Sequence, residues 1–515
     1  MSIEYQKESI LENRSLLDEM SNLYSNHYGV WGKTSKNRGK RIALSPARIQ
    51  GWVQSEHAYI ATARDEKKLI GYAIAVIAST NKQEYNNPKK LISWVTQLVV
   101  HEEYRQKGIA KTLLFSFWGF SNYYAWGILS ASPYAIRALE SATKRTSIPA
   151  KIDKRQKKII KFGIDYINYI TQETEFFINK EASKANTNFP SDISDINDKL
   201  ANVKSTEVPW NMGMIEEGWE WFAFTFNDQE RKKLTGNEVE ELLKSSDEMA
   251  AQAYSRMPMD NMSQGWAKFQ KHEIDFLIEQ CKLSLGESIL DVGCGTGRHS
   301  LELAHRGYNV FGVDYANELI NQAKRKSKDK NINAKFARVD FRDTDLQSEY
   351  DTVLCVYDVI GSFVDEKKNE QIIENIYKHT KNNRYALISV MNFELTESIA
   401  KYKFQFANNP DSIFEIPASN TMEKTGNIFN PKYFTVDTDN GIVYRREQFS
   451  MGTNLQTELI VRDKRYARQE ICNICEKHGF KIIFSRYVQA GKWDIELAST
   501  DKKAKEILVL CQKIN

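Results

Sequence analysis

The chain has 515 residues, of which 41% are hydrophobic and 27% are charged, and its formal net charge is +4. This length suits about two or three domains, and the near-balanced charge gives no reason to expect a nucleic-acid partner. No apolar run is long enough to span a membrane and the N-terminus is too polar for a signal peptide, so we expect a cytoplasmic protein with no membrane partner.

Predicted strands and helices alternate through the first part of the chain, which is typical of an α/β domain. Leu16, Met20 and Leu23 recur at helical spacing. Two apolar runs, 58–63 and 69–79, flank a polar turn and favour a hairpin. The predicted helices cover 9–24, 46–53, 109–120 and 134–143, and the predicted strands cover 58–63, 69–79, 92–100 and 124–130.

A basic loop containing a glycine joins the strand 92–100 to the helix that begins near residue 109. Free backbone N–H groups and the helix dipole make such a helix N-terminus an anion site suited to a pyrophosphate. A solvated basic loop is the alternative. The pattern Arg105-x-x-Gly108-x-Ala110 resembles motif A of the GNAT acetyltransferases. The resemblance implies that acetyl-CoA binds through Val100, Arg105, Lys107, Gly108, Ile109 and Ala110.

Two positions depart from the GNAT pattern where catalysis is concerned. Leu139 stands where many members carry a tyrosine that protonates the departing thiolate, and Gln97 stands where many carry a glutamate base. Neither side chain can transfer a proton. Amine acetylation can also proceed through proximity and oxyanion stabilisation, so a catalytic domain and a domain that only binds its ligand both stay open. The candidates for proton transfer are Tyr134, which we favour, Tyr123, Glu102 and Glu103.

The stretch 146–235 gives weaker signals. Residues 181–207 are polar and are predicted to form a lid or a disordered insertion. The rings of an aromatic run, 218–226, are expected to pack in the core rather than to line an acceptor pocket. Charged residues near 228–236 mark the expected boundary between domains 1–232 and 233–515. The predicted elements are a helix over 151–160 and strands over 162–170 and 218–226.

Residues 287–314 carry the strongest functional signal in the chain. A short apolar strand contains Asp291 and leads into three alternate glycines, which let the backbone turn tightly and approach a ligand. A helix and a second strand follow, and Asp314 at the end of that strand can accept hydrogen bonds from a ribose diol. The simpler alternative is a tight strand-to-helix turn. A dinucleotide site would need a glycine where Arg298 stands.

The Asp-x-Gly-x-Gly-x-Gly pattern resembles motif I of the class I S-adenosylmethionine-dependent methyltransferases, over roughly residues 240–515. The resemblance implies that S-adenosylmethionine lies over the glycine loop, with its ribose on Asp314 and its adenine beside Asp340 and Phe341. The implied cofactor-binding residues are Asp291, Gly293, Gly295, Gly297, Asp314, Asp340 and Phe341.

The remaining elements complete that architecture. Leading helices over 237–280 present Tyr254, Trp266 and Phe269 to the cofactor, and the loop 358–363 is where the methyl group would be delivered. Tyr357 and Asp358 are the catalytic candidates there. The predicted strands cover 308–313, 337–341, 350–357 and 385–391, followed by an antiparallel pair over 480–488 and 507–511.

An insertion over 393–465 contains three predicted antiparallel strands around the turn Asp439-Asn440-Gly441. An added β layer of this kind resembles small-molecule methyltransferases, in which it encloses the acceptor; an inert structural sheet is the alternative. Cys472 and Cys475 lie in a helical pattern without a second pair, so we expect packing residues and no metal site.

The expected architecture is α/β throughout: a GNAT-like mixed-sheet domain, then a Rossmann-like seven-stranded methyltransferase domain with the inserted β layer. We expect a bifunctional transferase that methylates and acetylates a small-molecule acceptor bearing an amine, using S-adenosylmethionine and acetyl-CoA. The alternatives are a methyltransferase whose first domain only binds acyl-CoA or substrate, and a nucleic-acid-modifying enzyme. The sequence does not indicate the acceptor's identity, the order of the steps or the oligomeric state.

Overall fold

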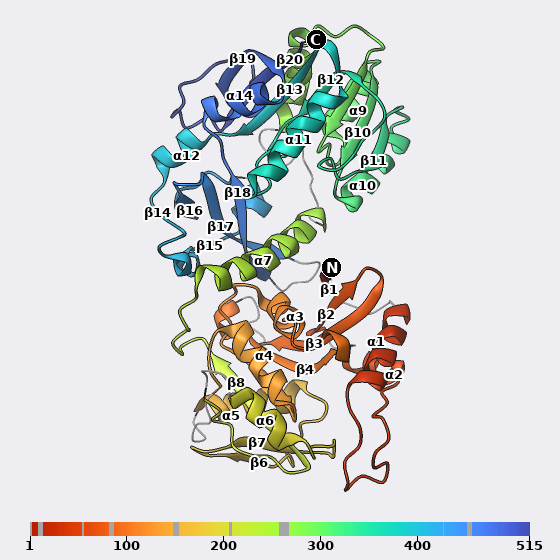
Figure 1. The fold of residues 1–515 in the computed structure, drawn as a ribbon, viewed down its shortest axis with the longest axis vertical. Coiled ribbons are helices and arrows are strands. Elements are labelled where there is room, and N and C mark those ends of the chain that lie inside the picture. The colour runs from red at the N-terminus through yellow and green to blue at the C-terminus, as the bar shows by residue number, and fades with distance from the viewer. Residues whose placement is uncertain are drawn as a thin grey trace. The chain divides into compact units, whose positions relative to one another are not determined.

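Two units make up the chain (Figure 1). The computed structural model describes residues 3–8, 14–53, 56–81, 87–147, 154–204, 209–256, 267–425, 427–450 and 456–514. The first unit comprises 1–234, 244–249 and 450–459, and the second comprises 235–243, 250–449 and 460–515. Among the described residues, no helix is long and apolar enough to cross a membrane.

The first unit is organised around a mixed eight-stranded sheet in the order β1-β2-β3-β4-β5-β8-β7-β6. Helices α3, α4 and α6 pack on one face, and α1, α2 and α5 pack on the other. Figure 1 shows α3 and α4 crossing the sheet. The strands are β1 (Ile3–Glu8), β2 (Ala58–Asp65), β3 (Lys68–Ala78), β4 (Ile92–Val100), β5 (Ala125–Ser130), β6 (Phe176–Ile178), β7 (Ser183–Phe189) and β8 (Gly218–Phe226). The helices are α1 (Arg14–His27), α2 (Pro46–Val53), α3 (Ile109–Trp118), α4 (Pro133–Thr143), α5 (Lys154–Tyr166) and α6 (Ile196–Lys204).

The parallel neighbours β4 and β5 form a fork. They pair only over Ile92–Val95 and Ala125–Ile128, and the described residues beyond these points do not pair with each other. The loop that leads into α3 follows the free end of β4, and α4 follows the free end of β5. The fork therefore brings the predicted pyrophosphate loop and the start of α4 to the same edge of the sheet.

Two predictions for the first unit are wrong. The strand expected over 162–170 is instead the second half of α5 and the turn after it, because Ile159, Phe162 and Gly163 recur at helical spacing and are buried. A Cβ on Gly163 would lie 2.8 Å from the Trp94 ring, so the helix packs closely on the sheet. The lid or disordered insertion expected over 181–207 is instead β7 and α6, with 205–208 outside the described residues.

Strand β7 and helix α6 were not predicted because residues 181–207 are mostly polar. Strand β7 pairs through its backbone with β6 and β8, which needs no apolar side chains, and the Ser183 hydroxyl donates to the Phe222 carbonyl at 2.6 Å. Helix α6 buries only Ile196, Leu200 and Val203. The short strand β1 was also not predicted.

The second unit contains the predicted seven-stranded sheet, in the order β11-β10-β9-β12-β13-β20-β19. The first five strands run parallel and β20 is antiparallel to both β13 and β19. The strands are β9 (Ser288–Val292), β10 (Asn309–Asp314), β11 (Lys335–Arg338), β12 (Tyr350–Cys355), β13 (Thr380–Met391), β19 (Phe480–Val488) and β20 (Glu506–Lys513).

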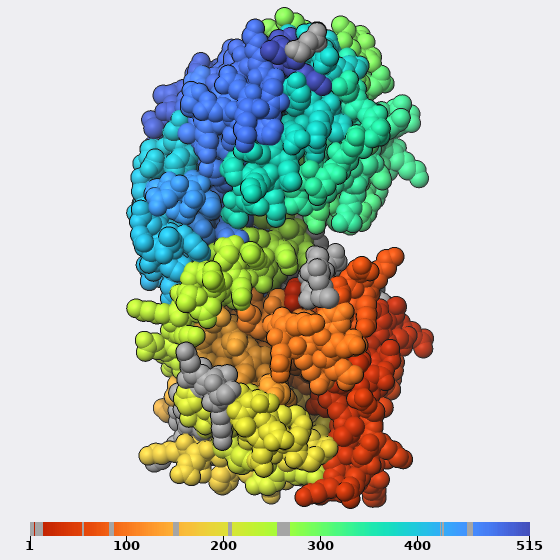
Figure 2. Space-filling view, viewed as in Figure 1, coloured from red at the N-terminus to blue at the C-terminus, as the bar shows by residue number. Residues whose placement is uncertain are grey.

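Helices cover both faces of this sheet. Helices α11 (Glu366–His379) and α14 (Arg468–Lys477) pack on one face, and α8 (Gln270–Gln280) and α9 (Arg298–His305) on the other. Helix α10 (Asn317–Asp329) packs beside β11. Cys472 and Cys475 are buried in α14, which confirms that they are packing residues. Helix α7 (Gly236–Arg256) precedes these elements, and its polar outer face is exposed (Figure 2).

The insertion forms a separate five-stranded sheet, which we call the cap layer. It consists of β14 (Lys403–Phe404), β15 (Ala418–Ser419), β16 (Phe434–Asp437), β17 (Ile442–Ser450) and β18 (Gln456–Lys464). The three strands predicted from the sequence correspond to β16, β17 and β18. Helix α12 (Phe393–Ile399) and the short helix α13 (Thr421–Thr425) belong to the same insertion.

Candidate active sites

The glycine loop of the second unit follows β9 and turns into α9. Gly293 has φ +72°, and a Cβ there would lie 2.3 Å from Val359 Cγ2. Gly297 has φ +81°, and a Cβ there would lie 2.9 Å from the Phe336 ring. Gly295 also has positive φ, but nothing lies within 4 Å of its Cβ position. Two glycines thus permit close packing, while the middle one leaves the backbone open to a ligand.

Asp314 is tied to this loop by its carboxylate. Its Oδ2 accepts from the Gly295 N–H at 2.9 Å and its Oδ1 accepts from the Ala316 N–H at 2.8 Å. Burial raises the pKa of Asp314, against the effect of these two bonds. A carboxylate has about four acceptor positions, so two remain for a diol. Asp291 lies behind the loop, where it is buried and accepts from the Ser300 hydroxyl at 2.5 Å.

The residues expected beside the adenine, Asp340 and Phe341, follow β11. Asp340 is half-buried and pairs with Arg342, whose Nε donates at 2.8 Å. This pairing lowers the pKa of Asp340. Phe341 is packed in the core, with its ring 5.5 Å from that of His379. Trp266, which we expected over the cofactor, lies outside the described residues.

Tyr357 is held by a buried ionic network. The fully buried Glu273 of α8 is 2.6 Å from Arg298 Nη1 and 2.9 Å from His299 Nε2, and it accepts a hydrogen bond from the Tyr357 hydroxyl. Burial alone would raise the pKa of Glu273, but His299 and Arg298 lower it. Sequence analysis missed this network, because its members come from two helices and only their contact distinguishes them from ordinary charged residues.

Asp358 follows Tyr357, and both have a φ of +62°, which is strained for residues with a side chain. The Asp358 Oδ1 atom is buried and has no hydrogen-bond partner among the described residues. Burial, with the charge of Asp463 added, raises the pKa of Asp358 to about 7, although Arg445 and Arg465 act against this. Such a carboxyl exchanges protons near neutral pH, which is the property needed in an acid–base group.

Glu506 is a second buried carboxyl of this region that the sequence did not reveal. It begins β20 and is 5% exposed. Burial, together with the charge of Glu273, raises its pKa to about 8. Nothing in its sequence context distinguishes it from an ordinary strand-end glutamate.

The candidate loop of the first unit has the conformation expected of an anion site. Gln106 and Gly108 have positive φ values of +62° and +79°, and nothing lies within 4 Å of the Gly108 Cβ position. The first amides of α3, at Ile109 and Ala110, lack partners within the helix. Arg105 does not extend over this turn, since its Nε donates to the Val100 carbonyl at 3.2 Å and its Nη2 to the His27 carbonyl. Lys107 lies over the Tyr104 ring at 5.1 Å.

Tyr134, the favoured proton-transfer candidate of the first unit, contacts α6, and the two positions that depart from the GNAT pattern are buried. The Tyr134 hydroxyl accepts from Asn202 Nδ2 of α6 at 3.2 Å. Leu139 is fully buried in the core, so a tyrosine could not replace it without overpacking. Gln97 is buried and accepts from the Tyr72 hydroxyl at 3.0 Å.

A better candidate is Glu220 of β8, which sequence analysis did not consider. It is 7% exposed, and burial raises its pKa to about 7 against hydrogen bonds from Thr187 and the Ala131 N–H. Ala131 directly follows β5, so the carboxyl lies at the open end of the fork. Burial, Tyr24 and Glu220 together raise the pKa of Tyr28, whose ring stacks on Tyr24 at 4.2 Å. A carboxyl among aromatic rings suits an ammonium group.

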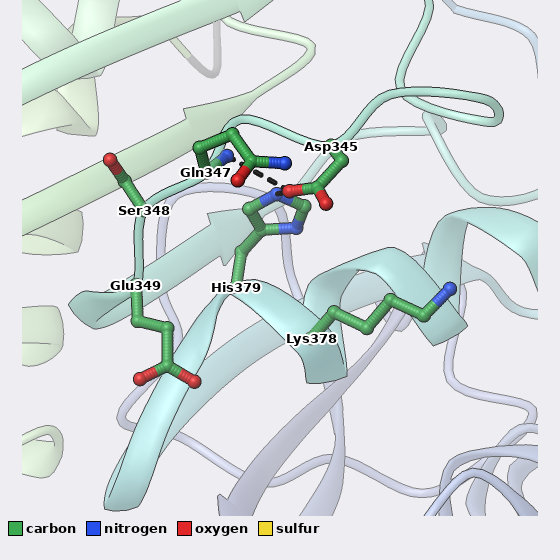
Figure 3. Close-up of a pocket in the computed structure, with 6 residues that line it drawn as sticks. All are labelled: Asp345, Gln347, Ser348, Glu349, Lys378 and His379. Carbon is green, nitrogen blue, oxygen red and sulfur yellow. Dashed lines mark hydrogen bonds and ion pairs between the residues drawn. The ribbon is translucent and has the colours of Figure 1, made fainter.

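A surface pocket at the other end of the methyltransferase-like sheet has no comparable chemistry (Figure 3). It is lined by residues before β12 and at the end of α11, whereas the glycine loop lies at the carboxyl ends of the strands. His379 accepts from the Leu346 N–H at 2.9 Å and its Nδ1 lies 2.7 Å from the Asn375 carbonyl. Both ring nitrogens are thus engaged, and this histidine joins α11 to β12 as a structural residue.

Comparison with protein families agrees with the two folds. The fork and basic loop define a GNAT-like unit, and the seven-stranded sheet with its glycine loop defines a Rossmann-like transferase unit. Residues 19–116 match the acetyltransferase (GNAT) family model, and residues 289–383 match a methyltransferase domain model. The chain joins a GNAT-family domain to a domain of the S-adenosylmethionine-dependent methyltransferase class.

The curated relatives match this chain only in part. The probable S-adenosyl-L-methionine-dependent methyltransferase TehB of Haemophilus influenzae is 31% identical over 134 residues, 26% of this chain and 44% of the relative. The ubiquinone biosynthesis O-methyltransferase of Rickettsia akari is 33% identical over 106 residues, covering 20% and 40%. The glycine/sarcosine N-methyltransferase of Parasynechococcus marenigrum is 25% identical over 131 residues, covering 25% and 46%. The chain thus spans less than half the length of each of these relatives.

A solved structure of an S-adenosylmethionine-dependent methyltransferase from Clostridium acetobutylicum matches this chain at a TM-score of 0.36 and 16% identity. It covers 48% of this chain, and 92% of its own length is matched.

Proposed function

We propose that the chain is a cytoplasmic, bifunctional transferase that methylates and acetylates a small-molecule amine, with S-adenosylmethionine and acetyl-CoA as donors. One observation supports the methylation part above all. Asp358 is half-buried, its Oδ1 atom is buried and lacks a partner among the described residues, and it follows a strand next to the glycine-loop strand. A nucleophile bound to it would lie beside the donor.

The residues present fit S-adenosylmethionine. The open side of Gly295 gives room for the amino-acid end of the cofactor, and Asp314 retains acceptor positions for its ribose. When bound, this cofactor supplies a methyl group made electrophilic by the adjoining sulfonium. Arg342 already occupies part of the Asp340 carboxylate, so adenine recognition rests less on that side chain than the sequence predicted.

Asp358 would hold the acceptor amine and take its proton. Methyl transfer is an in-line displacement, so the nitrogen must present its lone pair at about 3–3.5 Å from the methyl carbon. As the N–C bond forms and the C–S bond breaks, the proton that leaves nitrogen passes to the ionised Asp358. A carboxyl with a pKa of about 7 can accept this proton and release it again at neutral pH.

Tyr357 would position this carboxyl instead of reacting itself. Its hydroxyl is engaged with Glu273, and its backbone N–H donates to the Ser389 hydroxyl at 2.9 Å. These contacts fix two consecutive residues in a left-handed conformation, which costs about 1–3 kcal/mol each. The strain is consistent with a loop shaped for function.

Acetylation would take place at the fork of the first unit. The left-handed turn at Gly108 and the first amides of α3 would bind the pyrophosphate of acetyl-CoA. Glu220 would take a proton from an ammonium acceptor, so that the neutral nitrogen can attack the thioester carbonyl. The N–C bond would then form as the C–S bond breaks, and the departing CoA thiolate would take up the second proton that the nitrogen loses. The alternative, a first unit that only binds its ligand, is favoured by the absence of titratable groups at Gln97 and Leu139.

An amine acceptor is also consistent with one relative, which is named as a glycine/sarcosine N-methyltransferase. Another relative is named as an O-methyltransferase, so a hydroxyl acceptor is the second candidate. The six free, buried cysteines support a reducing compartment such as the cytoplasm. The near-neutral charge supports a small molecule over a nucleic acid.

The test is methyl transfer by the full chain to matched amines and alcohols, with S-adenosylhomocysteine and methylated product measured by mass spectrometry. We expect amine products that Asp358→Asn reduces at least a hundredfold, while binding of S-adenosylmethionine persists. Methylation of alcohols only, unaffected by Asp358→Asn, would overturn the proposal. Release of CoA from acetyl-CoA with the same amines tests the acetyl step.

A further inference from the structure

The cap layer buries an unusual set of charged side chains. Arg445 and Glu447 alternate along β17, while Asp463 lies at the end of β18 and Arg465 follows that strand directly. Side chains two apart on a strand lie on one face. Their exposed fractions are 4%, 2%, 2% and 0%, although charged residues are rarely buried without full pairing. We call these four residues the cap cluster.

The hydrogen bonds of the described residues satisfy the guanidinium group of Arg465 but not that of Arg445. Arg465 Nε donates to Asp463 Oδ2 at 2.7 Å, while its Nη1 and Nη2 donate to Thr396 Oγ1 at 2.9 Å and the Ile428 carbonyl at 3.3 Å. Arg445 Nη2 lies 3.0 Å from Asp463 Oδ1, but its Nε is 3.6 Å from Glu447 Oε1. Arg465 is therefore a structural residue, whereas Arg445 retains N–H donors that no neighbour among the described residues accepts.

Several buried polar atoms consequently lack hydrogen-bond partners among the described residues. In the cap cluster and at Asp358 they are Nε and Nη1 of Arg445, Oε2 of Glu447, Oδ1 of Asp358 and Oδ1 of Asp463, the last of which still lies 3.0 Å from Arg445 Nη2 as an ion pair. Leaving such a group unsatisfied costs about 1–3 kcal/mol, and more when it is charged. Unsatisfied donors and unsatisfied acceptors in one region indicate a ligand that carries both hydrogen-bond acceptors and hydrogen-bond donors.

The cap cluster directly adjoins the loop 358–363, which we call the methyl-transfer loop because the proposed methyl transfer would take place there. The Lys464 N–H donates to the Gly361 carbonyl at 2.8 Å, and a Cβ on Gly361 would lie 2.5 Å from the Lys464 carbonyl oxygen. This close backbone contact places Asp463 beside Asp358, as their electrostatic interaction shows. Tyr254 of α7 also faces the charges of Arg445, Glu447 and Asp358.

We propose that Arg445, Glu447 and Asp358 recognise the acceptor, and that the acceptor is a compact zwitterion. Its carboxylate would accept from Arg445 Nη1, and its amine would lie between Asp358 and Glu447. This inference rests on the proposed function and adds the substrate class to it.

The unsatisfied hydrogen-bond groups, together with charge, select this class over its competitors. Asp358, Glu447 and Asp463 carry three negative charges when ionised and Arg445 and Arg465 carry two positive ones. A simple amine would leave the donors of Arg445 unsatisfied, and a dianion such as a phosphate would be repelled by the carboxylates. A zwitterion adds no net charge and supplies both an acceptor and donors.

The experiment uses the full chain, S-adenosylmethionine and a panel of α-, β- and γ-amino acids, each with its methyl ester and its decarboxylated amine. Formation of S-adenosylhomocysteine gives kcat/KM, and calorimetry gives S-adenosylmethionine affinity. We expect at least one amino acid to exceed its ester and amine at least tenfold. Arg445→Gln should reduce that preference to within twofold with unchanged cofactor affinity, and Arg445→Lys should retain part of it.

Arg446→Gln is the matched control, because Arg446 lies on the opposite face of β17 and donates to the Phe414 carbonyl at 3.3 Å. It should leave the preference intact. Esters or simple amines that react as well as the acids would overturn the inference and leave the proposed function standing. If S-adenosylmethionine binds but no member of the panel is methylated, the zwitterion assignment is also overturned. Failure of S-adenosylmethionine to bind would overturn the proposed function itself.

Discussion

Replacing Asp358 with asparagine is expected to stabilise the fold at and above pH 7 while it abolishes methyl transfer. In the folded protein, burial and the Asp463 charge raise the pKa of Asp358 from 3.8 to about 7. A carboxyl with a raised folded-state pKa favours folding below its unfolded pKa, and this contribution is lost as the pH rises through the folded pKa. Asparagine has no proton to lose, so the variant escapes that loss.

The size of the effect follows from the same pKa. At about 1.4 kcal/mol per pKa unit, a rise from 3.8 to about 7 corresponds to a ceiling of roughly 4 kcal/mol. Asp358 keeps some contact with solvent, and screening reduces the value, so we expect a gain of about 1–3 kcal/mol.

Denaturant unfolding of the wild type and Asp358→Asn at a series of pH values measures this gain. The difference in free energy of unfolding should be smallest below pH 4, grow between pH 4 and 7 and stay constant above that. Any loss of hydrogen bonding in the variant adds an offset that does not depend on pH, and Glu506 titrates in both proteins. Parallel curves over the whole range would refute the reasoning about Asp358.

Three further predictions concern the other site residues. Asp314→Asn should lower S-adenosylmethionine affinity at least tenfold by calorimetry with the fold retained, because it weakens charge-assisted hydrogen bonds worth about 1.5–3 kcal/mol each; unchanged affinity would remove the ribose assignment. Gly108→Glu should abolish thermal stabilisation by CoA through repulsion of the pyrophosphate, whereas Gly108→Asn, which tolerates the left-handed φ of +79°, should largely keep it. In the wild type, acetyl turnover should rise with pH through about 7 as Glu220 ionises. The Glu220→Gln variant should not show this rise, and a variant whose pH profile matches the wild type would exclude Glu220 as the base.

The sequence was most informative where local pattern and fold agree. The strand Ser288–Val292 and the glycine loop after it were predicted with correct bounds, because a buried parallel strand is a continuous apolar run and the glycines end it abruptly. Strand β4 and helix α2 were also predicted with correct bounds. The stretch 162–170 was misjudged because several isoleucines and aromatics suit either a strand or a buried helix.

The site was less accessible to sequence reasoning than the fold. Asp358 was a candidate because it follows the fourth strand, but its surroundings could not be foreseen. The sequence around Arg445 and Glu447 has several charged residues, and such a strand normally faces water. Only the return of β18 reveals that they are buried together, and no single-sequence pattern joins positions from β17, β18 and the methyl-transfer loop.

The short segment from Tyr357 to Gly361 has a thermodynamic consequence. At one end, Tyr357 is bound to Glu273, whose partner Arg298 begins the helix after the glycine loop; at the other, Gly361 is bound to Lys464 of the cap layer. A donor that orders the first end and an acceptor that orders the second would act on one strained segment. Each would then strengthen the binding of the other by the same factor, since linkage between two binding equilibria is reciprocal. The loop would thus make the enzyme cooperative between unlike ligands.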